Sequence, residues 1–222
     1  MADWSVVDLV PGVWAAVVAA LVVAALRRWY DRVSWPVLAL FALPIVVLFG
    51  PALFAGRVLL PLDNLRGAAP FRDLAPTEPH GNLLQGDLIE LVTPSVAATR
   101  EAFVDGRWPL WNGRVGAGMP LLADPQAQAL APLVRLVDVL PLVRAPGALA
   151  ALRAFCALLF FFLAVRRLGL STGPAVCGAL AYGLGGFVVL WVGWPLANAA
   201  ALLPFGVYAA VRAEQVGGRR DL

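Results

Sequence analysis

The sequence predicts an all-α, polytopic transmembrane protein with about five spans and one long loop outside the membrane. Of its 222 residues, 61% are hydrophobic and 14% are charged, whereas soluble domains usually carry about 25% charged residues. The mean hydropathy is +0.80. Several uncharged stretches also approach the roughly 20 apolar residues that a helix needs to cross a bilayer. These observations exclude an ordinary soluble domain.

The predicted spans divide the chain into three parts. Two N-terminal spans fill residues 1–55, a polar loop follows over 56–145, and three spans occupy 146–222 together with the start of a cytoplasmic loop. The last apolar block is too long for one crossing, and Gly193–Pro195 is expected to divide it. The expected spans are Leu9–Leu26, Ser34–Ala55, Pro146–Val165, Pro174–Val192 and Leu196–Val211.

The positions of the arginines predict the orientation. The net charge is only +3 and every basic residue is Arg. This scattered charge is typical of membrane topology and predicts no nucleic-acid partner. With five spans, three arginine clusters fall on one side, and short Arg-rich loops face the cytoplasm. We therefore expect a bacterial inner (plasma) membrane protein whose 56–145 loop is extracytoplasmic. The clusters are Arg27, Arg28 and Arg32; Arg166 and Arg167; and Arg212, Arg219 and Arg220.

Several kinds of chemistry lack a motif. Cys156 and Cys177 lie in apolar runs, where a thiol behaves as a small hydrophobic group. The single histidine, His80, is expected in a surface loop, and no His/Cys spacing suggests zinc. The chain ends in "RAEQVGGRRDL", which resembles a cytoplasmic loop. We expect the chain to be the N-terminal part of a longer membrane protein.

The 56–145 loop is expected to be ordered. Apolar residues recur at helical spacing from Leu88 to Phe103, which predicts an amphipathic helix over about 88–104. A second helix is predicted over Gln126–Leu140, lying in the membrane surface. The segment between them is rich in Gly and Pro, and long loops that are not linkers usually have a function.

Asp87 has two interpretations. Asp87 followed by Glu90 resembles a capping box at the start of the 88–104 helix, in which a carboxylate accepts otherwise unpaired backbone N–H groups. The same carboxylate is also a candidate general base, because a capped carboxylate is held rigidly. Pro94 lies inside this helix and is expected to kink it by removing a backbone hydrogen bond.

Other polar residues of the loop are candidates for sugar binding. Asp124 precedes Pro125 and either starts a turn or, with Gln126, binds sugar hydroxyls. Trp108 and Trp111 either anchor the loop on the membrane surface or stack on a sugar. We include Trp111 and the adjacent Asn112 among the substrate-binding candidates.

Arg153 is the one charged residue expected inside a span. A charge within a membrane is costly and suggests a function. Snorkelling to the interface is the competing explanation. As a functional group, Arg153 would hold the phosphate of a lipid carrier, because a guanidinium matches phosphate geometry.

The loop also resembles a known family. "GDLIELVTP" followed by "FVDGRWPLWNGRVGAGMPLLADPQ" resembles the first extracytoplasmic loop of the YfhO-like bacterial membrane proteins. The matching features are a Gly-Asp pair with Pro94 seven residues after Asp87, a "PLW" segment, and the glycines Gly116 and Gly118. The resemblance covers about residues 55–211. The chain departs from it by having Glu90 and Leu91 where polar residues follow the Asp, and by an additional first helix.

The resemblance implies a C-type glycosyltransferase fold and activity. Such enzymes take sugars from polyprenyl-phosphate carriers and place an essential acidic residue in the first outside loop. It implies that Asp87 is catalytic, and we include Glu90, three residues later, as a second catalytic candidate. The expected partners are membrane lipid, a polyprenyl-phosphate-linked sugar and a glycan or lipid acceptor. The carboxylate would take the acceptor's proton or hold a divalent metal ion, and the sequence leaves the cofactor unknown.

Two alternatives remain at this stage. The first is a non-enzymatic transport or scaffold protein for envelope polysaccharide, whose loop binds glycan without cleaving a bond. A transporter should place polar groups midway through several spans, whereas this chain has almost none beyond Arg153 and Asn198. The second is a truncated, inactive gene product.

Overall fold

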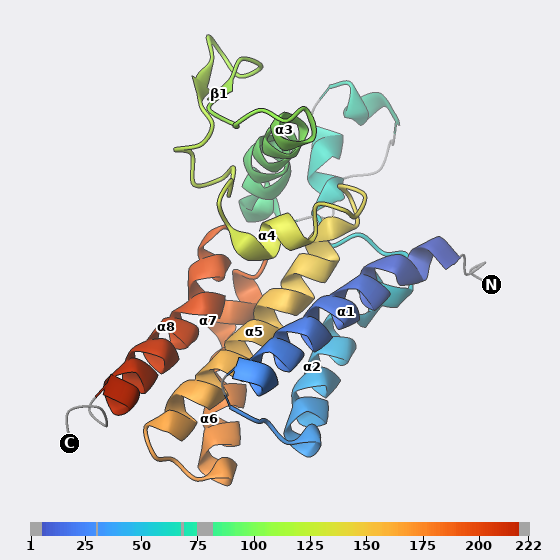
Figure 1. The fold of residues 1–222 in the computed structure, drawn as a ribbon. Helices are drawn as coiled ribbons and strands as arrows, with labels where there is room; N and C mark the ends of the chain where they lie inside the picture. The colour runs from blue at the N-terminus through green and yellow to red at the C-terminus, as the bar shows by residue number, and fades with distance from the viewer. Residues whose placement is uncertain (1–5, 30, 68, 75–81, 218–222) are drawn as a thin grey trace. The chain divides into compact units, whose positions relative to one another are not determined.

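The structure is a computed structural model that describes residues 6–29, 31–67, 69–74 and 82–217 (Figure 1). It is mostly helical and forms two compact units. Met1–Arg57 and Gly147–Leu222 make up one unit, and Val58–Pro146 the other. We call them the bundle unit and the loop unit, and describe each by itself.

Within the described residues, the bundle unit has five helical segments long and apolar enough to cross a membrane. This finding confirms the predicted number of spans. The fourth segment is interrupted after Gly183, because Gly185 is extended with φ −61° and ψ 152°, and glycines favour helix ends over helix interiors. The segments are α1 (Val6–Trp29), α2 (Trp35–Phe54), α5 (Ala145–Arg167), α6 (Thr172–Gly183) with α7 (Gly186–Leu190), and α8 (Leu196–Gly217).

Helix α5 forms the core of the bundle unit. Its side chains are buried on all faces between Gly147 and Leu163, as expected for a helix that is apolar all round. Glycines permit the close approaches. A Cβ on Gly147 would lie 2.8 Å from the Cβ of Ala52, and one on Gly183 would lie 2.7 Å from the side chain of Leu158. Small residues therefore let α2 and α6 pack directly on α5.

The α1–α2 connection, the end of α5 and the end of α8 meet at one end of this unit. Arg167 donates two 2.7 Å hydrogen bonds to Asp31, and Tyr208 Oη donates to Asp31 at 2.6 Å. Burial alone would raise the pKa of Asp31, but the hydrogen bonds from Tyr208 and Arg167 outweigh it and lower that pKa. The α1–α2 connection and the ends of α5 and α8 thus share one end of the bundle unit, while Arg219 and Arg220 lie outside the described residues and the predicted orientation stays a prediction.

The loop unit combines short helices with one β-hairpin. Its main helical run is a π-helical turn over Leu88–Val92 continued by α3 (Thr93–Val104), which confirms the helix predicted over 88–104. The strands β1 (Trp111–Asn112) and β2 (Met119–Pro120) pair antiparallel. The remaining elements are the 3₁₀ turns Leu62–Gly67, Phe71–Leu74 and Leu83–Gln85, and the helix α4 (Pro132–Leu136).

The helix predicted over Gln126–Leu140 is wrong. Only Pro132–Leu136 is helical, and turns surround it. Gln128 has φ +50°, which is incompatible with a right-handed helix. Ala131 is extended at ψ 112° because the residue before a proline avoids the helical region. The prediction for His80 lies outside the described residues.

Candidate functional site

Asp87 does not cap the helix on which it lies. Asn82 takes that role five residues earlier, since its side chain accepts a 3.0 Å hydrogen bond from the backbone N–H of Leu84. The chain is already helical at Gly86 and Asp87. The carboxylate of Asp87 makes no capping hydrogen bond, so the predicted capping box is wrong. The exposed Asp87 side chain is left available for other contacts.

The helical turn after Asp87 is widened. The N–H and the Oγ1 of Thr93 both donate to the carbonyl oxygen of Leu88, the latter at 2.6 Å. Pro94 follows and has no N–H to offer to the Glu90 carbonyl. A π-helical turn at this point absorbs the missing hydrogen bond. Such turns inside α-helices are frequent at functional sites.

Glu90 is the nearest carboxylate in sequence to Asp87. Both side chains are exposed and lie three residues apart in the chain. Glu90 turns back toward the start of the helix, because its Oε1 is 3.6 Å from the position that a Cβ on Gly86 would occupy. Two carboxylates together with phosphate oxygens are a donor set that Mg²⁺ accepts. No group of three metal-ligating side chains occurs among the described residues.

Asp124 and Gln126 lie together and are tied to α3. Asp124 Oδ1 accepts from the N–H of Gln126 at 2.9 Å, which is the turn that the sequence suggested. Asp124 Oδ2 also accepts from Ser95 Oγ of α3 at 3.3 Å. The buried Oε1 of Gln126 has no hydrogen-bond partner in the part of the chain that the structure describes. A buried acceptor without a partner is rare, which makes Gln126 the better binding candidate of the two.

Trp111 and Asn112 form the first strand of the hairpin. The indole of Trp111 covers Gly118, where an added Cβ would lie 2.4 Å from Nε1. The indole is thereby held against the hairpin, while the residue stays 58% exposed. Asn112 is buried, and its Oδ1 accepts from the N–H of Arg114 at 3.0 Å. Asn112 thus shapes the loop, and Trp111 offers the surface.

Arg153 belongs to the bundle unit and is 1% exposed. Its Nε donates to Asn198 Oδ1 at 3.0 Å, and its Nη1 donates to the carbonyl oxygen of Val192 at 2.7 Å. These bonds join α5 to α8 and to the turn before it. Arg153 is thus held by polar partners within the unit, and both its snorkelling to the interface and its role in phosphate binding stay predictions.

The structure adds a charged cluster that sequence reasoning missed. Arg135 of α4 approaches Asp138 to 2.8 Å and faces the ring of Phe103 at 5.3 Å. Arg100 Nη1 donates to the carbonyl oxygen of Leu140 at 2.6 Å. Burial lowers the pKa of Arg135 and raises the pKa of Asp138. The i,i+3 spacing of Arg135 and Asp138 could have predicted their ion pair from the sequence. The contact of Arg135 with Phe103 of α3 could not be predicted, because it depends on the fold.

Comparisons with protein-family models, with curated proteins and with solved structures find no match for this chain. The functional argument therefore depends on the site itself.

Proposed function

We propose that this chain functions in a membrane glycosyltransferase that moves a sugar from a polyprenyl-phosphate carrier to a cell-envelope acceptor at the outer face of the membrane. Asp87 takes the proton of the acceptor hydroxyl. The acceptor oxygen then attacks the anomeric carbon, and the bond from that carbon to the phosphate oxygen breaks. The phosphate leaves on its lipid.

The observation that carries the proposal is the position of Asp87. A carboxylate that only capped a helix would be occupied by backbone N–H groups, whereas Asn82 holds that position and Asp87 is exposed. A general base has to reach the proton that it removes. An exposed carboxylate on a rigid helix beside a π-helical turn meets this requirement.

The other candidates have supporting roles. Glu90 is exposed three residues after Asp87 and would hold a divalent metal ion, which would stabilise the charge of the departing phosphate and leave Asp87 as the base. The exposed indole of Trp111 offers a surface for a sugar ring, and Gln126 lies beside Asp124 as a further polar candidate. Exposed apolar side chains precede Asp87, with Leu83 at 75% and Leu84 at 86%. They are suited to contact with the lipid of the carrier.

The test compares wild type with Asp87→Asn in membranes supplied with radiolabelled polyprenyl-phosphate sugars. Loss of a general base lowers rates by about 10²–10⁴-fold, and we expect that loss at unchanged expression. Asp105→Asn is the matched control, because Asp105 is an exposed carboxylate at the other end of α3. Equal labelling by both variants contradicts the role of Asp87. Absence of transfer by wild type across a broad donor set favours a glycan-binding scaffold instead.

A further inference from the structure

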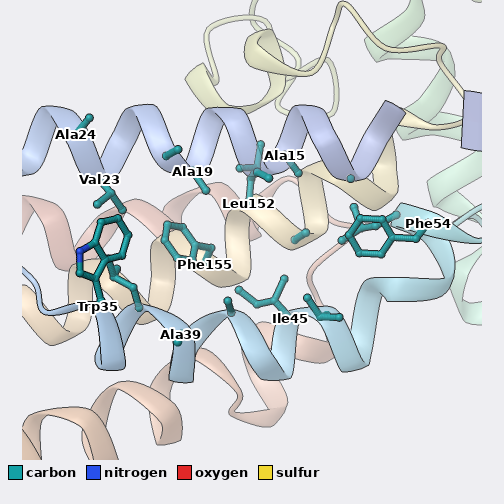
Figure 2. Close-up of a pocket in the computed structure, with 18 of the residues that line it drawn as sticks. Ala15, Ala19, Val23, Ala24, Trp35, Ala39, Ile45, Phe54, Leu152 and Phe155 are labelled. Atoms are coloured by element: carbon teal, nitrogen blue, oxygen red, sulfur yellow. The ribbon is translucent and has the colours of Figure 1, made fainter. Parts of the chain in front are cut away.

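The bundle unit contains a long apolar groove between α1 and α2. It encloses about 580 Å³, and Figure 2 shows Leu152 and Phe155 of α5 between the two helices at its base. Alanine is the most frequent residue in its walls. Several of these alanines are exposed, so the groove opens at the outer surface of the unit, where membrane hydrocarbon would meet it. The exposed alanines are Ala16, Ala20, Ala24, Ala39 and Ala42.

Bulky contacts at both ends hold α1 and α2 apart. At one end the ring of Phe54 lies against Gly12, where an added Cβ would be 2.1 Å from the ring. At the other end the guanidinium of Arg27 lies over the ring of Trp35, with Cζ 4.1 Å from the centroid. Figure 2 shows Trp35 and Phe54 at opposite ends of the groove. The small side chains between these contacts cannot fill the space.

The Trp35 end of the groove is strongly basic. A second hollow of about 860 Å³ contains Arg28 and Arg32, and it shares Ala24, Arg27 and Trp35 with the groove. Within the described residues, no ion pair joins these three arginines to a carboxylate. Asp31 lies in the same connection, but it is bound by Arg167 and Tyr208.

Arg27 has hydrogen-bonding capacity left at this end. Its Nη2 donates to the carbonyl oxygen of Val33 at 2.6 Å. Its Nε is buried and has no partner in the described part of the chain. An unpaired buried donor is costly, and the Arg27 guanidinium lines the hollow where an anionic oxygen would bind.

We propose that this groove binds one anionic phospholipid, with an acyl chain between α1 and α2 and the phosphate at Arg27, Arg28 and Arg32. Basic pockets between membrane helices are suited to anionic headgroups, and guanidinium groups bind phosphate through charge-assisted hydrogen bonds. The site is independent of the glycosyl transfer proposed above.

The length of the groove favours a phospholipid over a polyprenyl phosphate. The stretch of α1 from Gly12 to Arg27 is about 22 Å long, whereas one leaflet is about half of the ~30 Å hydrocarbon core. A fatty acyl chain therefore fits inside it. Phe54 packs on Gly12 at the far end, and a polyprenyl chain much longer than the groove would extend beyond it.

The experiment is native mass spectrometry of the complete chain, loaded with phosphatidylglycerol or with phosphatidylcholine of the same acyl chains. Each arginine near an anionic headgroup adds to the free energy of binding. The three arginines together should give wild type a preference of about tenfold or more for phosphatidylglycerol. The triple variant Arg27→Gln, Arg28→Gln, Arg32→Gln should lose that preference. A triple variant with the same net charge should keep it, made by Arg57→Gln, Arg66→Gln and Arg107→Gln. Equal preference in both variants overturns the proposal.

A second pair of variants tests the apolar part with all arginines present. Ala20→Phe fills the groove and should lower retention of phosphatidylglycerol, whereas Val17→Phe, on an exposed position outside the groove, should not. Equal retention in the two variants contradicts the groove as the site.

Wild type alone provides tests that do not depend on how well any variant folds. Long-chain phosphatidylglycerol should bind more tightly than a short-chain form, and inorganic phosphate should not displace it. Displacement by inorganic phosphate, or tighter binding of polyprenyl phosphate, would overturn the assignment to a phospholipid.

Discussion

The two units use their charged side chains differently. In the bundle unit, Arg153 is buried and bonded to Asn198 and Val192, and Arg167 holds Asp31 by two hydrogen bonds. In the loop unit, Asp87 and Glu90 are exposed. Arg153 and Arg167 thus join helices of the bundle unit, whereas Asp87 and Glu90 lie at the surface of the loop unit.

This difference shows which charge is available to a substrate. Sequence composition drew attention to Arg153, because a charge in an apolar span is conspicuous. A buried guanidinium is satisfied only by partners with good geometry, and Asn198 of α8 and Val192 of the preceding turn provide them. Asp87 is less conspicuous in the sequence, yet its exposure and the cap at Asn82 leave it able to act on a bound molecule.

The largest expected effect is that of Arg153→Ala. Breaking a buried charged interaction costs about 3–5 kcal/mol of folding free energy, and here Asn198 and the Val192 carbonyl would lose a donor. We expect a clear decrease in the midpoint of thermal unfolding in detergent. Arg107→Ala is the control, because exposed substitutions change stability by about 0.5 kcal/mol or less. An Arg153→Ala protein that unfolds like wild type but binds donor lipid weakly would favour the phosphate-binding role.

A smaller effect is expected at the Asp31 end of the bundle unit. Tyr208→Phe removes the 2.6 Å hydrogen bond to Asp31 and keeps the ring. Hydrogen bonds to charged groups contribute about 1.5–3 kcal/mol. We expect the lower part of that range because Asp31 is 34% exposed. Thermal unfolding of wild type and variant at neutral pH measures this difference.

The same cluster predicts a pH dependence. The pKa of Asp31 in the folded protein lies below its ordinary value of 3.8. The ionised Asp31 carboxylate therefore contributes its full stabilisation of the folded protein at pH values above 3.8. This contribution is lost as the pH falls through the lower pKa of the folded state. Wild type and Asp31→Asn should converge in stability below about pH 4. If the difference in stability between wild type and Asp31→Asn stayed constant down to the most acidic conditions, the role given to the ionised carboxylate would be contradicted.

The spans were predictable from the sequence and the loop unit only in part. Five apolar stretches gave five candidate spans because burial in lipid is read directly from hydropathy. The interruption at Gly185 was missed, since a glycine tolerated within an apolar run also permits an extended residue. The Gln126–Leu140 helix failed because its apolar residues are used in turns. The positive φ of Gln128 and the extended Ala131 decide that geometry.

The candidate site was predictable in its residues but not in their roles. The sequence placed Asp87, Glu90, Asp124 and Gln126 in one ordered loop. It could not predict that Ser95 holds Asp124, because that contact joins residues far apart in the chain. Nor could it choose between two possible helix starts, since Asn82 and Asp87 are both good capping residues.

The smallest expected effect decides between those two helix starts. Removing a side-chain cap costs about 0.5–2 kcal/mol, so Asn82→Ala should lower the thermal stability of the protein. Asp87→Ala should leave it nearly unchanged, because Asp87 makes no capping hydrogen bond. If Asp87→Ala lowers the thermal stability and Asn82→Ala does not, Asp87 is the capping residue, and its position would no longer support catalysis. If only Asn82→Ala is destabilising while only Asp87→Ala loses glycosyl transfer, the two residues divide structure and chemistry between them.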